Sequence, residues 1–131
     1  MRYYVYPATV TRIIDGDSIE VKLDMGHHMH KEEADIRLLG INTPEVRGEE
    51  KELGKVAKSR VEELLPLGTK VVVHSAKLDS FGRMLADVWI MNQYEKSISE
   101  ILVEEGYAIA WDGKGSRPKF DLTIEYPIKP E

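Results

Sequence analysis

The fold is indicated first by residues 9–23, TVTRIIDGDSIEVKL. Two runs rich in valine, isoleucine and threonine flank the turn formed by Asp15, Gly16 and Asp17, which is the pattern of an antiparallel strand pair. In the second run apolar and polar residues alternate, so one face of that strand is expected to be buried. The segment therefore predicts strands over residues 9–14 and 18–23.

Further elements follow in both directions from this pair. The predicted elements are strands over residues 34–41, 69–74 and 83–91, a helix over residues 49–65, and a short helix opening at residue 97. The long helix carries one apolar stripe and stops at Pro66. The short helix begins with a capping box made by Ser97 and Glu100, and Gly106 ends it. Residues 122–128 are a candidate for one more strand.

Size and composition fit a single soluble domain over residues 1–131. The chain has 131 residues, of which 42% are apolar and 31% charged, which is enough for one core and too little for two. We expect the core over about residues 8–111 and a C-terminal tail over 112–131. No segment is long enough to cross a membrane and the N-terminal residues lack a signal-peptide core. A cytoplasmic monomer is therefore expected, or a secreted protein if a leader has been removed.

The charge and cysteine content limit the function classes. Eighteen basic residues against 23 acidic ones give a net charge of −5, which argues against a protein that coats nucleic acid. An enzyme that binds one phosphate group locally is still allowed. The absence of cysteine excludes disulfides and thiolate metal sites.

Carboxylate, carboxamide and guanidinium groups gather where the predicted strands end. Residues 37–45, RLLGINTPE, carry Arg37 and Glu45, and residues 79–83, DSFGR, bring Arg83 before another strand. Oxygen ligands such as those of the aspartates at 15 and 17 suit a hard divalent cation. Arginine forks onto phosphate oxygens. These motifs predict chemistry on a phosphodiester.

The motifs, taken in order, resemble those of the staphylococcal (micrococcal) nuclease or thermonuclease-like family: D-G-D, then R-L-L-x-x-x-T-P-E, then D-x-[YF]-G-R. The resemblance covers about residues 8–111. It implies that the strands close into a five-stranded Greek-key barrel of the OB-fold type with two or three helices, an α+β fold that is mostly β. It also implies Ca²⁺-assisted hydrolysis of DNA and/or RNA, with attack of water on phosphorus and 3′-phosphate products.

The same resemblance implies a role for each site residue. Asp17, Asn42 and the main-chain carbonyl of Thr43 would bind Ca²⁺ or another divalent cation, with Asp15 behind Asp17. Glu45 would orient or deprotonate the attacking water. Arg37 and Arg83 would stabilise charge on the phosphate.

Strand alternation gives a separate expectation for one of the two arginines. It places Arg37 on the same face as Leu39 and Ile41, which is the apolar face. The side chain of Arg37 is therefore expected to be paired with another group instead of being solvated.

Two departures from the family pattern affect the proposed activity. Asn42 stands where aspartate is usual, and losing one formal charge should weaken cation binding. The favoured interpretation is a weakened but active nuclease, and the alternative is an OB-fold module that binds nucleic acid or protein. Ser80 and Phe81 stand where a lysine and a tyrosine are usual, although Phe81 could still stack on a base.

Two further groups leave alternatives open. Lys114, Arg117 and Lys119 form a basic run that could follow a nucleic-acid backbone or simply solubilise the tail. The histidines at 27, 28 and 30 are expected at a solvated hairpin tip, and a histidine metal site or regulatory role is the weaker alternative because their spacing does not suit zinc.

Overall fold

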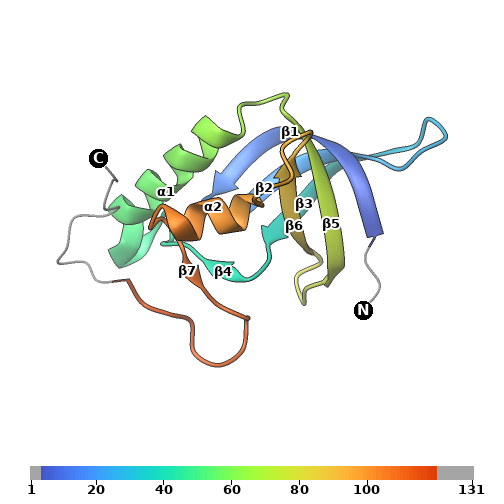
Figure 1. Cartoon of the computed structure of the whole chain (residues 1–131). Coiled ribbons are helices and arrows are strands. Elements are labelled where there is room, and N and C mark those ends of the chain that lie inside the picture. Colours follow the sequence, from blue (N-terminus) through green and yellow to red (C-terminus); the bar gives the residue numbers. More distant parts are fainter. Residues whose placement is uncertain (1–3, 121–131) are drawn as a thin grey trace.

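The computed structural model describes residues 4–120, and five of its strands form a closed barrel (Figure 1). The barrel strands are β1 (Tyr4–Asp15), β2 (Ser18–Asp24), β3 (His30–Leu38), β5 (Lys70–Leu78) and β6 (Met84–Ile90). They neighbour one another in the order β1, β2, β3, β6, β5, and β5 returns to β1. All pairs are antiparallel except β3 and β6, which run parallel. The predicted α+β barrel is confirmed.

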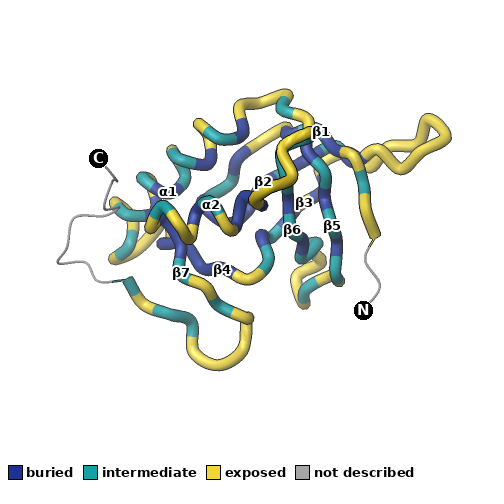
Figure 2. The backbone as a smooth tube through the Cα atoms, viewed as in Figure 1, coloured by how far each residue is buried: buried dark blue, intermediate teal, exposed yellow. Residues whose placement is uncertain are grey.

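Alternating burial along the strands builds the core. In β2 the side chains of Ile19, Val21 and Leu23 are at most 1% exposed, as the sequence pattern predicts. In β3 the buried positions are likewise every second residue. Buried backbone follows the inside of the barrel in Figure 2, whereas the hairpin tip between β2 and β3 is exposed. The barrel therefore holds a single core.

The predicted third strand, residues 34–41, is wrong in its end. β3 stops at Leu38, and Gly40 adopts a φ of +79° that turns the chain. A two-residue strand, β4 (Ile41–Asn42), then pairs with β7 (Ile109–Ala110) outside the barrel. The alternation of buried and exposed residues breaks at this turn. The core face of β3 carries the buried residues Ala34, Ile36 and Leu38, and Arg37 lies on the opposite face.

The long helix covers one end of the barrel, beside the turn between β1 and β2 (Figure 1). A 3-10 turn, η1 (Gly48–Glu50), leads into α1 (Lys51–Leu64). Ala57 and Val61 on its predicted apolar stripe are completely buried. The helix ends before Pro66, as predicted.

The second helix, α2 (Ile98–Glu104), has the predicted capping box. Ser97 Oγ accepts a hydrogen bond from Glu100 N at 3.2 Å, and Glu100 Oε1 accepts one from Ser97 N at 3.2 Å. Arg60 of α1 forms a two-pronged ion pair with Glu105 at 2.6 and 2.9 Å. This contact ties the two helices together.

Other predicted boundaries also differ from the structure. β1 begins at Tyr4 and β5 runs to Leu78, because the two strands pair beyond the apolar segments that predicted them. The candidate strand over 122–128 lies outside the described residues. Within residues 4–120, no helix is long and apolar enough to cross a membrane.

Gly54 in α1 sets how closely the helix approaches the loop after β4. A Cβ at this position would overlap the carbonyl group of Glu45 and lie 2.6 Å from Val46 N. We expect Gly54→Ala to lower the free energy of unfolding by roughly 1–3 kcal/mol, although alanine normally favours a helix by about 1 kcal/mol. Urea denaturation measures the difference.

The matched control is Ser59→Ala, at an exposed position of the same helix. Its free energy of unfolding should stay within about 0.5 kcal/mol of the wild-type value. Equal stability of Gly54→Ala and the control would show that the helix can move away from the loop.

Candidate functional site

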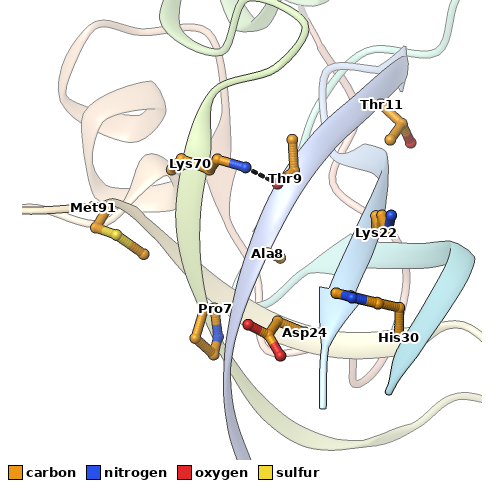
Figure 3. A pocket seen from close by; sticks show the side chains of 9 residues that line it. All are labelled: Pro7, Ala8, Thr9, Thr11, Lys22, Asp24, His30, Lys70 and Met91. Carbon is orange, nitrogen blue, oxygen red and sulfur yellow. Dashed lines mark hydrogen bonds between the residues drawn. The ribbon is translucent and has the colours of Figure 1, made fainter. Parts of the chain in front are cut away.

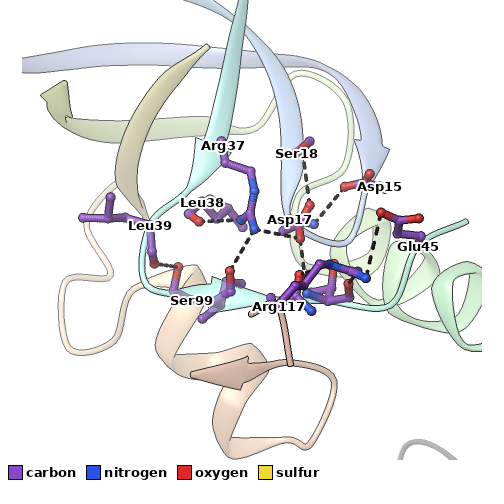
Figure 4. A network of polar contacts seen from close by, with 12 residues as sticks. Asp15, Asp17, Ser18, Arg37, Leu38, Leu39, Glu45, Ser99 and Arg117 are labelled. Atoms are coloured by element: carbon purple, nitrogen blue, oxygen red, sulfur yellow. Dashed lines mark hydrogen bonds and ion pairs between the residues drawn. The ribbon is translucent and has the colours of Figure 1, made fainter. Parts of the chain in front are cut away.

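Asp17 is the centre of a buried polar network (Figure 4). It lies in the turn between β1 and β2 and is 8% exposed. Its Oδ2 accepts a hydrogen bond from Thr43 N at 3.2 Å and lies 3.3 Å from Arg37 Nη2. Its main-chain oxygen accepts a hydrogen bond from Leu38 N at 2.8 Å. One residue thus connects the turn, the end of β3 and the loop after β4.

Arg37 is held in place by main-chain oxygens as well as by Asp17. Nη1 donates to the oxygen of Leu38 at 2.8 Å and Nη2 to the oxygen of Ile41 at 3.0 Å. The side chain is 14% exposed, so the expectation that it is paired holds although the expected face was wrong. Its Nε makes no hydrogen bond with the described residues. Both terminal nitrogens of the guanidinium therefore have protein partners, and these contacts fix its position.

Glu45 lies at the rim of the network. The residue follows the buried Pro44, and its side chain is 63% exposed. Its main-chain N–H donates to Glu50 Oε1 at 3.1 Å. The loop is thus fixed while the carboxylate faces solvent, where it can meet a water molecule.

Glu50 is a site residue that the sequence analysis missed. Its side chain is only 16% exposed, and it lies at the end of η1. In the sequence it is one of two successive glutamates before a helix, where acidic residues are common because they favour the helix dipole. No local signal distinguishes it from its exposed neighbour Glu49.

Arg117 reaches into the site from the C-terminal segment (Figure 4). Nε donates to Asn42 Oδ1 at 2.8 Å, and Nη2 donates to the Thr43 carbonyl oxygen at 2.9 Å. Nη2 also lies 3.3 Å from Glu50 Oε1, and Nη1 lies 3.9 Å from Glu45 Oε1. The sequence placed this arginine in a basic tail, whereas the structure places it against two of the three expected cation ligands.

The other expected residues lie apart from this network. Arg83 donates from Nε to Asp79 Oδ2 at 2.8 Å, and its guanidinium lies 5.7 Å from the ring centre of Phe81. Phe81 is 83% exposed, and Lys114 bonds through its main chain to Asp112 at 2.9 Å. No hydrogen bond or ion pair within residues 4–120 joins these groups to Asp17. Their roles stay predictions.

The histidines do not assemble into a centre. His27, His28 and His30 are exposed at the β2–β3 hairpin. Across the part of the chain that the structure describes, no three or more histidine, cysteine, aspartate or glutamate side chains are grouped to hold a metal ion.

A hollow of about 420 Å³ lies elsewhere on the barrel wall (Figure 3). Lys22, Asp24, His30 and Lys70 are among its lining residues, and Lys70 Nζ donates to Thr9 Oγ1 at 2.7 Å. No hydrogen bond or ion pair among the described residues joins its lining side chains to the Asp17 network. The candidate site is therefore the network and not this hollow.

The expected divalent cation fits the chemistry of the ligands but not their present contacts. Asp17, Asn42 and the Thr43 carbonyl offer the oxygen atoms that hard cations prefer. Two of these oxygens already accept hydrogen bonds from Arg117. A divalent cation held by these oxygens would also be repelled by the positive charge of the guanidinium. In this arrangement Arg117 occupies hydrogen-bonding positions of two of the three expected ligand oxygens.

Asp15 and Asp17 form a coupled carboxyl pair with opposite pKa shifts. Burial, with the hydrogen bond and charge of Asp17, raises the pKa of Asp15 to about 7. Burial also penalises the charged form of Asp17, but its hydrogen bond with Asp15, the charge of Arg37 and the N–H of Thr43 together lower its pKa. Near neutral pH the pair therefore tends to share one proton.

This pair predicts a pH-dependent stability in metal-free buffer. Between about pH 4 and 7 the folded protein keeps a proton on Asp15 that the unfolded chain has released, so stability should fall as pH rises, with a slope of at most about 1.4 kcal/mol per pH unit. The loss should level off above the folded pKa. Asp15→Asn should remove this slope, as measured by urea denaturation from pH 4 to 8.

Asp35→Asn is the control for the pH series. Asp35 is exposed on β3, and its carboxylate makes no hydrogen bond with the described residues. Its substitution should leave the slope unchanged. A slope that survives Asp15→Asn would assign it to another group.

Comparison with known proteins identifies the family of the chain. A family model described as staphylococcal nuclease homologue matches residues 35–124. That span includes Arg37, Glu45 and Arg117 and begins after the turn that carries Asp15 and Asp17. A comparison with curated proteins gives no match. Because the matched span covers more than half of the chain and the barrel has the expected topology, the chain belongs to the staphylococcal nuclease homologue family.

Proposed function

We propose that the chain hydrolyses phosphodiester bonds in DNA and/or RNA at the Asp17 network. One observation carries this proposal: a fixed, largely buried Arg37 and a solvent-facing Glu45 are joined through Asp17 and Thr43 into one site. Membership of the nuclease family supports the same class of function.

The two side chains suit different parts of the reaction. Water held by the Glu45 carboxylate would attack phosphorus and pass a proton to that carboxylate. The positive charge of Arg37 would stabilise the negative charge that develops on the phosphate oxygens. The resemblance assigns the 5′-oxygen as the leaving group, which would give 3′-phosphate products. Arg83, whose Nε bonds to Asp79, would contribute a second positive charge to the phosphate.

A divalent cation, with Ca²⁺ as the first candidate, belongs to this proposal only for a form of the site without Arg117. In that form the ligands would be Asp17, Asn42 and the Thr43 carbonyl. No step of the reaction above depends on it.

A second candidate function is a nucleic-acid-binding or protein-binding module on the same barrel. The observation that favours it is the filling of the expected cation position by Arg117. Such a module would not need Glu45 as a base, and its binding should survive loss of that carboxylate.

The two functions separate in a cleavage assay on the full chain. Labelled single-stranded DNA and RNA are incubated with Ca²⁺, Mg²⁺, Mn²⁺ or EDTA. Glu45→Gln should lower the cleavage rate by about 10²- to 10⁴-fold while leaving the thermal unfolding midpoint close to that of the wild type, because this side chain is largely exposed. Arg37→Lys should also lower the rate, because lysine cannot reproduce the forked contacts.

Glu49→Gln is the matched control, since Glu49 is an exposed neighbour in the same loop region. Its rate should stay within about twofold of the wild-type rate, as for a surface position. Wild-type binding without cleavage under every condition, unchanged in Glu45→Gln, would reject the nuclease and support the binding module.

A further inference from the structure

The C-terminal segment supplies its own positive charge to the expected cation position. Arg117 lies within hydrogen-bond distance of Asn42 Oδ1 and the Thr43 carbonyl oxygen, at 2.8 and 2.9 Å. It also approaches Glu50 at 3.3 Å and Glu45 at 3.9 Å. The guanidinium is thus surrounded by protein oxygens and has few N–H groups left for a phosphate.

From this we infer that Arg117 is the resident cation of the site and that it excludes a divalent metal ion until residues 117–118 withdraw. The inference rests on the cation position that the proposed function uses. It adds that this position has two alternative occupants, a guanidinium from the chain itself and a metal ion from solution. Occupation by one prevents occupation by the other.

Both polar groups of the Asn42 carboxamide bond to the C-terminal segment. Its Oδ1 accepts from Arg117 Nε, and its Nδ2 donates to the carbonyl oxygen of Pro118 at 3.2 Å. An aspartate would place a charged oxygen against the Pro118 carbonyl, where no donor remains. The unusual asparagine therefore serves the bound segment, at the cost of a formal charge for a metal ion.

Charge favours exchange once the arginine leaves. Withdrawal of Arg117 would leave Glu45 and Glu50 without their positively charged partner. The Thr43 carbonyl oxygen would also lose the hydrogen bond that it accepts from Arg117. The charge of Asp17 is balanced in part by Arg37. The remaining excess of negative charge would attract a dication.

The segment can leave without disturbing the core. Residues 111–120 form no helix or strand, and the Arg117 side chain is 34% exposed. The loop before it is shaped by local contacts, such as the one from Trp111 Nε1 to the Lys114 carbonyl oxygen at 3.0 Å. Release would break the polar contacts of Arg117 and Pro118 with Asn42, Thr43, Glu45 and Glu50, none of which lies in a barrel strand.

The test measures metal affinity and not activity. Calorimetric titration of the full chain with Ca²⁺ compares wild type, Arg117→Ala, Arg117→Lys and Lys119→Ala. We expect Arg117→Ala to bind Ca²⁺ at least about tenfold more tightly than wild type, because the repelling charge is removed. Arg117→Lys should fall between them, since lysine keeps the charge but cannot fork.

Lys119→Ala is the control for charge alone. The exposed side chain of Lys119 lies two residues after Arg117 in the sequence. Removing its positive charge should leave the Ca²⁺ affinity within about twofold of wild type. Thermal unfolding in EDTA verifies that each variant is folded before titration.

Movement of the segment is read by a label. Because the chain has no cysteine, Ser116→Cys provides one attachment point for a spin label. Adding Ca²⁺ to this labelled protein should increase the mobility of the label, and the same label in an Arg117→Ala background should already be mobile without Ca²⁺.

Three outcomes would overturn the inference. One is that folded Arg117→Ala binds Ca²⁺ no more tightly than wild type, including no binding by either protein. Another is that Lys119→Ala gains as much affinity as Arg117→Ala. The third is that Ca²⁺ binds while the label stays immobile. None of these readouts uses cleavage. If the protein exchanges Arg117 for Ca²⁺ but cuts no nucleic acid, the proposed nuclease function is rejected and the inference about Arg117 stands.

Discussion

The candidate site depends on the contacts of one buried carboxylate. Asp17 holds Leu38 through its main-chain oxygen, and its side chain holds Thr43 and Arg37. These contacts fix the β1–β2 turn against the end of β3 and against the loop that carries Glu45. A carboxylate that is only 8% exposed is stable there because it accepts several hydrogen bonds and faces a guanidinium. Burial opposes the charged form of Asp17, but its hydrogen bond with Asp15, the charge of Arg37 and the N–H of Thr43 together lower its pKa, while the pKa of Asp15 is raised.

A second constraint is that two positions around the site, Gly16 and Gly54, must be glycine. Gly54 lets α1 lie directly against the main chain of Glu45, and Gly16 lets the turn approach Thr43, whose Oγ1 would be 2.9 Å from an added Cβ. The Thr43 hydroxyl is buried and makes no hydrogen bond with the described residues. Close main-chain approach thus sets the position of Glu45 and Thr43, while the charged contacts set their orientation. Packing and electrostatics act on the same short loop.

Most of the fold could be predicted from the sequence because its signals are local. The alternation in β2, the stripe of α1 and the capping box at Ser97 each lie within a few residues, and each is confirmed. The motif around Arg37 and Glu45 also brought together two residues of the candidate site, because both follow closely on one another near the end of β3. The end of β3 was predicted wrongly, since apolar residues continue past the turn that Gly40 makes. Arg117 could not be placed, because its partner Asn42 is 75 residues away in the sequence.

The contact between Arg117 and Asn42 changes how the asparagine is understood. Taken alone, Asn42 is an aspartate site that has lost a charge, and the expected consequence is weak metal binding. Beside Arg117 and Pro118 it is a group that both accepts and donates, which a carboxylate at neutral pH cannot do. Glu45 and Glu50 then supply the negative charge that the guanidinium needs. The asparagine therefore suits the arginine, and two of the hydrogen bonds that hold the guanidinium use oxygens of Asn42 and Thr43, which are two of the expected cation ligands.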